Sequence, residues 1–289
     1  MSFLRFRPEI WSARLLVALE KVLIFGSPTI TNRDYEGEIA QAGDTVRITS
    51  ISDPTIDDYV AGVTTITPEQ LTDAQRTLVV DQCKYFAFEV DDVDARQIAG
   101  NVMPTAMERA AYKLKDTIDQ FLAAFYTGAQ SANVVDEVTV DLSPTDWDTE
   151  AAKAYNEILV PLKVVLDEAN VQSDGRYCTM PPWLHGVLLR DPRFVEANKA
   201  GTTTGLRQGV VGQAAGFDIL ISNNCPNPSG SSHIVQAGVN SALTFAQQIN
   251  KTEAYRPQDS FSDAVKGLTL YGGKLIRPES IAYATATSS

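Results

Sequence analysis

The sequence is poor in the residues that most enzymes use for nucleophilic and metal chemistry. Among its 289 residues are only three cysteines, Cys83, Cys178 and Cys225, and two histidines, His185 and His233. The cysteines are odd in number and widely separated, so they form neither a disulfide framework nor the paired spacing of a zinc site. The sequence therefore predicts no metal and no cofactor, and its free thiols are typical of a reducing cytoplasm.

Motifs that bind phosphate or activate a nucleophile are also missing. The patterns GxGxxG, GxxxxGK[ST], HExxH and GxSxG do not occur. The best remaining arrangement for catalysis is a thiolate pair of Cys178 with His185. Because both lie in apolar segments, a packed sulfur and a hydrogen-bonded imidazole are favoured. We predict no catalytic residue, and a cytosolic cysteine hydrolase is the alternative from a different class.

Long hydrophobic runs and positive charge are scarce as well. No run of about 18 apolar residues occurs and no charged-then-apolar leader opens the chain, which predicts neither a membrane span nor a cleaved secretory leader. Lys plus Arg number 24 against 36 Asp plus Glu, a formal charge of −12. This excess of acid opposes sequence-independent binding to phosphate backbones, so any contact with nucleic acid must be local.

The charge is unevenly distributed. Residues 1–33 carry five basic and two acidic side chains, whereas residues 34–96 carry four basic and 14 acidic ones. By charge alone, the acidic stretch is more simply a solvated surface than a binding surface. In the basic stretch Arg5, Arg7 and Arg14 lie near aromatic residues. That pattern fits either an arm laid across a partner protein or a local contact with nucleic acid.

The first third of the chain is predicted to form a helix and a β-ribbon. Helix start and stop signals bracket an amphipathic run from Pro8 to Gly26. The stretch from Thr45 to Ile51 alternates like a strand, and the return limb is predicted over Thr77–Val90. A two-stranded ribbon is at best marginal in water, so it must dock against a neighbouring element or a neighbouring molecule.

The longest predicted element is an amphipathic helix from Thr105 to Thr127, about 35 Å long. Its apolar residues recur at three- and four-residue spacing, Lys115 and Asp119 fall outside that stripe, and Gly128 ends it. Later, the pair Gly272-Gly273 predicts a hairpin turn. The other predicted elements are strands at 134–142, 177–180 and 217–222, helices at 147–170 and 183–189, and a loop at 198–216.

Four stretches along the chain have patterns typical of one protein family. They are PEIWSARLLVALEK from Pro8, TNRDYEGEIAQAGDTVRI from Thr31, AAGFDILISNNCP from Ala214 and VKGLTLYGGKLIRPE from Val265. With the order of the predicted elements, they resemble the tailed-bacteriophage major capsid proteins of the Hong Kong 97-type fold. The resemblance spans nearly the whole chain.

The resemblance implies an α+β fold in four parts. Residues 1–33 would be the N-terminal arm and residues 34–92 an extended β-hairpin loop. Residues 93–145 and 249–289 would form a peripheral domain around the long spine helix, and residues 146–248 an axial domain.

The function implied by the resemblance is structural: self-assembly into hexamers and pentamers of an icosahedral head that encloses double-stranded DNA. In this family the extended loop lies across the adjacent subunit. Arg5, Arg7 and Arg14 become candidates for arm or interior-facing contacts. The candidates for contact between subunits are Tyr35, Glu36, Glu38, Asp44, Val46, Arg47, Ile48, Tyr59 and Arg76.

The partners implied are copies of the chain itself, a portal protein, a scaffolding protein, an optional decoration protein and packaged DNA bound without sequence specificity. The location implied is the virion capsid, assembled in the cytoplasm of a host bacterium. On the same fold, an encapsulin-like compartment shell would enclose an enzyme cargo instead of a genome, and neighbouring genes would distinguish the two.

Two departures from family patterns lead to expectations. Some members join subunits covalently through a lysine on the extended loop, yet no lysine occurs between Lys21 and Lys84. We therefore expect a shell without such cross-links. Many members also carry a removable N-terminal scaffolding segment, and none precedes the arm here, which favours a separate scaffolding protein.

Overall fold

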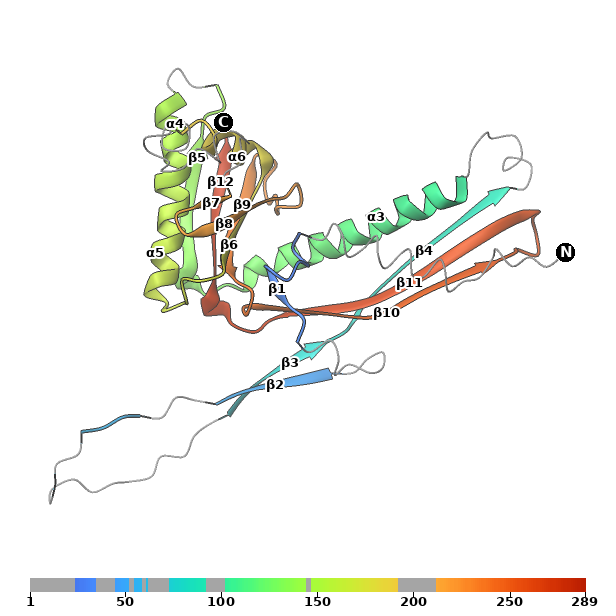
Figure 1. Ribbon diagram of the computed structural model, residues 1–289, viewed down its shortest axis with the longest axis horizontal. Coiled ribbons are helices and arrows are strands. Elements are labelled where there is room, and N and C mark those ends of the chain that lie inside the picture. The colour runs from blue at the N-terminus through green and yellow to red at the C-terminus, as the bar shows by residue number, and fades with distance from the viewer. Residues whose placement is uncertain are drawn as a thin grey trace.

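The computed structural model describes residues 24–34, 45–51, 55–58, 61, 73–91, 102–143, 147–191 and 212–289. It has three parts (Figure 1): a long sheet with one long helix along it, a compact sheet flanked by helices, and a projecting two-stranded ribbon. Most of the helix predicted from Pro8 to Gly26, and of the loop predicted at 198–216, lies outside the described residues.

The long sheet is built on two unusually long strands. β10 (Leu243–Tyr255) pairs antiparallel with β11 (Ser262–Leu275), and β4 (Gln82–Asp91) pairs antiparallel with the other edge of β11. The short β1 (Thr31–Asn32) runs parallel to the start of β10. The strand order is therefore β1-β10-β11-β4, with segments from both ends of the sequence.

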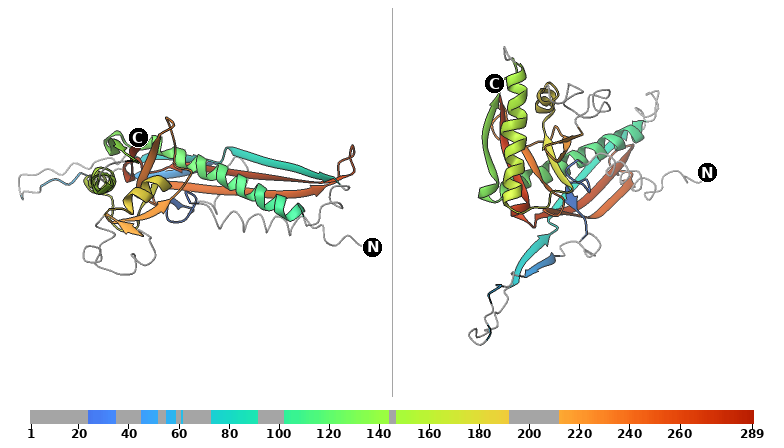
Figure 2. Two further views of the ribbon diagram at one scale, coloured as in Figure 1. Left: turned by 90° about the horizontal axis from the view of Figure 1, so that it is seen from above. Right: turned by 60° about the vertical axis from the view of Figure 1, so that its left-hand side comes forward.

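One face of the long sheet is covered by helix α3 (Val102–Ala123), as the left view in Figure 2, seen from above, shows. Met107, Ala111 and Leu114 are buried with Val265 of β11 because the apolar stripe of the helix faces the sheet. A 3-10 turn, η2 (Ala124–Gly128), follows α3 and ends at the predicted glycine.

Two polar residues of the long helix are buried. Lys115 and Asp119 lie outside the predicted apolar stripe, and each is only 4% exposed. Phe25, from the segment before β1, is buried in one cluster with Ile118 and Leu122 of α3. The helix is thus covered on more than the face that packs on the sheet, which periodicity alone does not predict.

The compact part is a six-stranded sheet in the order β5-β12-β9-β6-β8-β7. Two of its neighbouring pairs, β5 with β12 and β6 with β8, are parallel. The expected strands near 134, 177 and 217 are all present. The strands are β5 (Val134–Val140), β6 (Arg176–Met180), β7 (Gln213–Ala214), β8 (Phe217–Ile221), β9 (Ser232–Val239) and β12 (Ile281–Ser288).

A long helical segment packs on this sheet, with Ile158, Leu162 and Leu166 in its core (Figure 2). It is α4 (Trp147–Lys153), a π-helical stretch (Ala154–Leu159) and α5 (Val160–Glu168). The π-helical stretch precedes Pro161, whose ring would clash with a carbonyl one turn earlier in a regular α-helix. The shorter elements are α6 (Pro182–Leu188), η3 (Ser131–Asn133) and η5 (Pro278–Ser280).

The predicted hairpin turn at Gly272-Gly273 is wrong. Both glycines lie inside the continuous strand β11, opposite Ala246 and Phe245 of β10. A Cβ atom on Gly272 would lie 2.3 Å from the carbonyl oxygen of Val79. Gly272 therefore allows the chain entering β4 to pass close to the strand, whereas a Cβ on Gly273 would meet the side chains of Phe125 and Leu122.

Candidate assembly interface

The projecting ribbon consists of β2 (Thr45–Ile51) and β3 (Asp73–Val79), paired antiparallel from Thr45 opposite Val79 to Ile51 opposite Asp73. The single return limb predicted over Thr77–Val90 is divided between two sheets. Its first residues pair with β2, whereas β4 pairs with β11. The alternation continues across the junction, so the two-residue period could not show that the partner strand changes.

The ribbon packs on its own chain at the end nearest the long sheet. Leu78 and Val80 are buried with Ala246 and Leu270, and Ile48 packs against them. The opposite end, where Ile51 pairs with Asp73, extends away from both sheets in Figure 1. Apolar burial therefore anchors the base of the ribbon to its own chain.

The candidate contact residues fall into three groups. Val46 and Arg47 lie on β2, opposite Leu78 and Thr77. Ile48 packs at the ribbon base, and Arg76 donates a hydrogen bond from Nη1 to the carbonyl oxygen of Leu275 at 3.4 Å. The remaining candidates lie outside the described residues: Arg5, Arg7, Arg14, Tyr35, Glu36, Glu38, Asp44 and Tyr59.

A polar junction that the sequence did not reveal lies where the segment before β1, helix α3 and the loop after β8 meet. One oxygen of Asp119 on α3 accepts hydrogen bonds from the backbone N–H groups of Ile24 at 3.0 Å and Phe25 at 2.8 Å. Its other oxygen accepts one from Asn224 Nδ2 at 3.0 Å. These partners are 94 to 105 residues away along the sequence, so no local pattern could indicate them.

Burial dominates the electrostatics of this junction. It raises the pKa of Asp119 above the usual range, while the hydrogen bonds from Asn224, Phe25 and Ile24 act in the opposite direction. Lys115, one turn earlier, has a lowered pKa because burial disfavours its charged form. The only local sign was a carboxylate directly beside Ile118, a core position of the helix.

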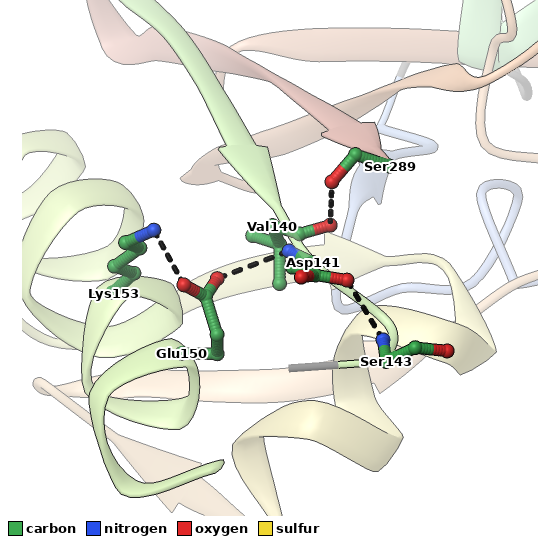
Figure 3. Close-up of polar contacts among 6 residues, drawn as sticks. All are labelled: Val140, Asp141, Ser143, Glu150, Lys153 and Ser289. Carbon is green, nitrogen blue, oxygen red and sulfur yellow. Dashed lines mark hydrogen bonds and ion pairs between the residues drawn. The ribbon is translucent and has the colours of Figure 1, made fainter. Parts of the chain in front are cut away.

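A second polar network closes the end of β5 (Figure 3). Glu150 of α4 is 8% exposed and accepts a hydrogen bond from the backbone N–H of Asp141 at 3.0 Å. It also pairs with Lys153 at 2.6 Å, and this bond is the main reason that the pKa of Glu150 is lowered. The backbone N–H of Ser289, directly after β12, donates to the carbonyl of Val140 at the end of β5. The end of β5 is thus bonded to both the end of the chain and helix α4.

The structure gives no support to the cysteine–histidine alternative. Cys178 is fully buried in β6, and burial raises its thiol pKa far above the ordinary value. A nucleophilic thiol requires the opposite shift. His185 is 9% exposed, and burial lowers its pKa. Neither residue therefore has the environment of a catalytic pair.

Within the described ranges, no group of three or more His, Cys, Asp or Glu side chains is arranged to hold a metal ion. No helix in the same ranges is both long and apolar enough to cross a membrane.

Solved structures with the same architecture come from phages. A chain of Mycobacterium phage Che8 is 29% identical, with 91% of each chain covered and a TM-score of 0.75. The capsid structure of cyanophage P-SCSP1u gives 17% identity, 93% and 90% coverage and a TM-score of 0.73. The mature capsid of bacteriophage PhiM1 gives 16% identity, coverage of 89% of this chain and 87% of that chain, and a TM-score of 0.69. The long sheet with its spine helix, the compact sheet and the ribbon thus define a major capsid protein of the Hong Kong 97-type α+β fold.

The sequence identifies the family directly. The family model described as "Phage capsid protein" matches residues 75–284, well over half of the chain. The chain therefore belongs to the phage capsid protein family, and its place is in the capsid of a virion. None of the curated proteins compared with it matches.

Proposed function

We propose that the chain assembles with copies of itself into the hexamers and pentamers of an icosahedral head that encloses double-stranded DNA. The division into arm (1–33), extended loop (34–92), peripheral domain (93–145 and 249–289) and axial domain (146–248) is part of this proposal. Assembly takes place in the host bacterial cytoplasm with a portal protein, a separate scaffolding protein and an optional decoration protein.

One observation carries the proposal: the ribbon projects from the body, to which buried apolar residues anchor it at its base. A two-stranded ribbon buries too little apolar surface to be stable by itself. In a closed shell each copy offers the same surface to its neighbour, so one ribbon site is repeated throughout the lattice. We infer that the ribbon lies across an adjacent copy. Arg5, Arg7 and Arg14 remain candidates for contacts of the arm or of the shell interior.

Electron microscopy of the expressed protein, with scaffolding protein added where needed, tests the proposal. Isometric particles are expected. A stable monomer that forms no particles under either condition would overturn it.

A shortened ribbon tests the role of the loop separately. Ile51 and Asp73 are paired, so the chain between them can be replaced by Asn-Gly, which forms a two-residue hairpin turn. The shortened protein is expected to keep its far-UV circular dichroism and melting temperature, because the ribbon base remains, but to lose particle formation. Particles formed as efficiently as by the full chain would show that residues 52–72 are not needed between subunits.

A further inference from the structure

We propose that Asp119 is a positioning residue: it fixes the point at which the N-terminal segment joins the body and ties that segment to the loop after β8. The three partners form a unit that we call the clasp, which consists of the Asp119 carboxylate, the Asn224 amide and the backbone N–H groups of Ile24 and Phe25. Its importance for assembly rests on the proposed capsid function, whereas its geometry does not.

The clasp holds the N-terminal segment at two successive residues. A single oxygen of Asp119 receives both N–H groups, at 3.0 and 2.8 Å. The Phe25 side chain is fully buried in the cluster that contains Ile118 and Leu122, on either side of Asp119 in α3. Backbone and side chain are thus both fixed before the chain enters β1 (Figure 1).

The clasp also reaches the compact sheet. Asn224 donates to Asp119, and its own backbone N–H donates to the Ser222 hydroxyl at 3.0 Å. The backbone N–H of Ser222 donates in turn to the carbonyl of Met180 in β6 at 3.1 Å. One carboxylate therefore connects the N-terminal segment, the spine helix and the six-stranded sheet.

All three described partners of Asp119 donate a hydrogen bond to it. An ionised carboxylate suits this position because it accepts hydrogen bonds and donates none. The nearby ionisable groups are Lys115 and Asp116 on the same helix and Cys225 beside Asn224. Lys115 attracts the Asp119 charge, and the other two groups oppose it when they are ionised.

The clasp adds direction to contacts that are otherwise apolar. One buried apolar cluster holds the N-terminal segment, the spine helix and the six-stranded sheet together without fixing their geometry. It contains Phe25, Leu122, Tyr177, Phe245 and Tyr271. Hydrogen bonds require defined distances and angles, so they specify one arrangement among those that the cluster allows. Loss of the clasp should therefore release the segment at Ile24 while the cluster preserves the fold.

A charge swap provides the test. Asn224→Asp places a second carboxylate against Asp119, so the two repel. Adding Asp119→Asn restores one donor facing one acceptor, and the new amide oxygen can still accept from Ile24 and Phe25. Asp119→Ala removes the clasp altogether. If that variant does not fold, the comparison of Asn224→Asp with the Asp119→Asn/Asn224→Asp double variant still tests the proposal.

Hydrogen exchange of the unassembled chain, followed by mass spectrometry, reports on the clasp. The amides of Ile24 and Phe25, followed in a peptide that begins at least two residues before Ile24, are expected to exchange on the order of tenfold faster in Asn224→Asp and at the wild-type rate in the double variant. A peptide from β9 serves as the internal control and should not change. Unchanged exchange at Ile24 in Asn224→Asp would overturn the clasp.

Particle yield, measured by electron microscopy on the same variants, reports on assembly. It should fall for Asn224→Asp and recover in the double variant. Faster exchange without loss of particles would overturn the role in assembly and leave the clasp in place. If the wild type forms no particles, the proposed function fails, while hydrogen exchange still decides whether the clasp exists.

Discussion

At the scale of single residues, the three cysteines differ sharply in environment. Cys83 is exposed on β4, whereas Cys178 and Cys225 are buried. Burial raises the pKa of Cys225 to about 12 and that of Cys178 further still. Since the thiolate is the reactive form, the thiolate fraction of Cys225 at pH 8 is on the order of 10⁻⁴.

A thiol titration of the unassembled native protein should therefore modify one cysteine rapidly. Two more are expected after denaturation, and Cys83→Ser should abolish the rapid phase. Rapid modification of two thiols in the native chain would contradict the burial of Cys178 and Cys225.

Glu150 gives a prediction with a defined pH dependence. Its folded-state pKa lies below that of the unfolded chain because Lys153 stabilises the charged form. The stabilisation is present above the unfolded value, about 4.3, and is lost as the pH falls through the lower folded value. Glu150→Gln should cost about 1 kcal/mol at pH 7 and almost nothing near pH 3.

Urea unfolding at several pH values measures this difference. The exposed Glu168, on the following helix, provides the control: Glu168→Gln should change stability little at any pH. A pH-independent cost of Glu150→Gln would show that the ion pair with Lys153 is not its cause.

At the scale of secondary structure, the sequence predicted what depends on neighbours along the chain. The spine helix, the helical segment from Trp147 and the strands near 134, 177 and 217 follow from local periodicity, and all are present. Two glycines show the limit of such patterns. A Gly-Gly pair has the same sequence whether it forms a hairpin turn or lies inside a strand that another segment approaches closely. The segment that approaches Gly272 contains Val79, which is far away along the chain.

The crossing at Gly272 predicts a destabilised variant. In Gly272→Ala the new methyl group would lie 2.3 Å from the Val79 carbonyl oxygen and 2.8 Å from Val80 Cα. Both atoms belong to the backbone, so relief requires a shift of the strand, at about 1–3 kcal/mol. Thermal unfolding should show a lower midpoint.

Gly186→Ala is the matched control. Apart from its chain neighbours and its own helix backbone, no atom lies within 4 Å of the position where its Cβ would be. The residue is inside helix α6, where alanine is favoured over glycine by about 0.5–1 kcal/mol. The same substitution should therefore have opposite effects at the two sites. An equal melting temperature for Gly272→Ala and the wild type would rule out the close crossing.

At the scale of the whole molecule, the family and the fold could be predicted because four matching stretches span the chain. The junction at Asp119 could not, because it forms only when Ile24 and Asn224 are brought together by folding. The division of the ribbon's return limb was missed for a similar reason: strand partners are chosen in three dimensions. Sequence patterns thus predicted the parts, and contacts between distant residues decide how the parts are joined.

The distribution of lysines along the chain leads to a prediction about how the proposed shell is held together. A covalent isopeptide bond from the ribbon would need a lysine amine, and the chain between Lys21 and Lys84 contains none. In the proposed shell we therefore expect non-covalent contacts, repeated at every copy of the interface, to join the subunits. Assembled particles boiled in detergent with reductant should therefore run as a single band of monomer mass. A ladder of dimers and higher multimers would show that another amine forms the bond.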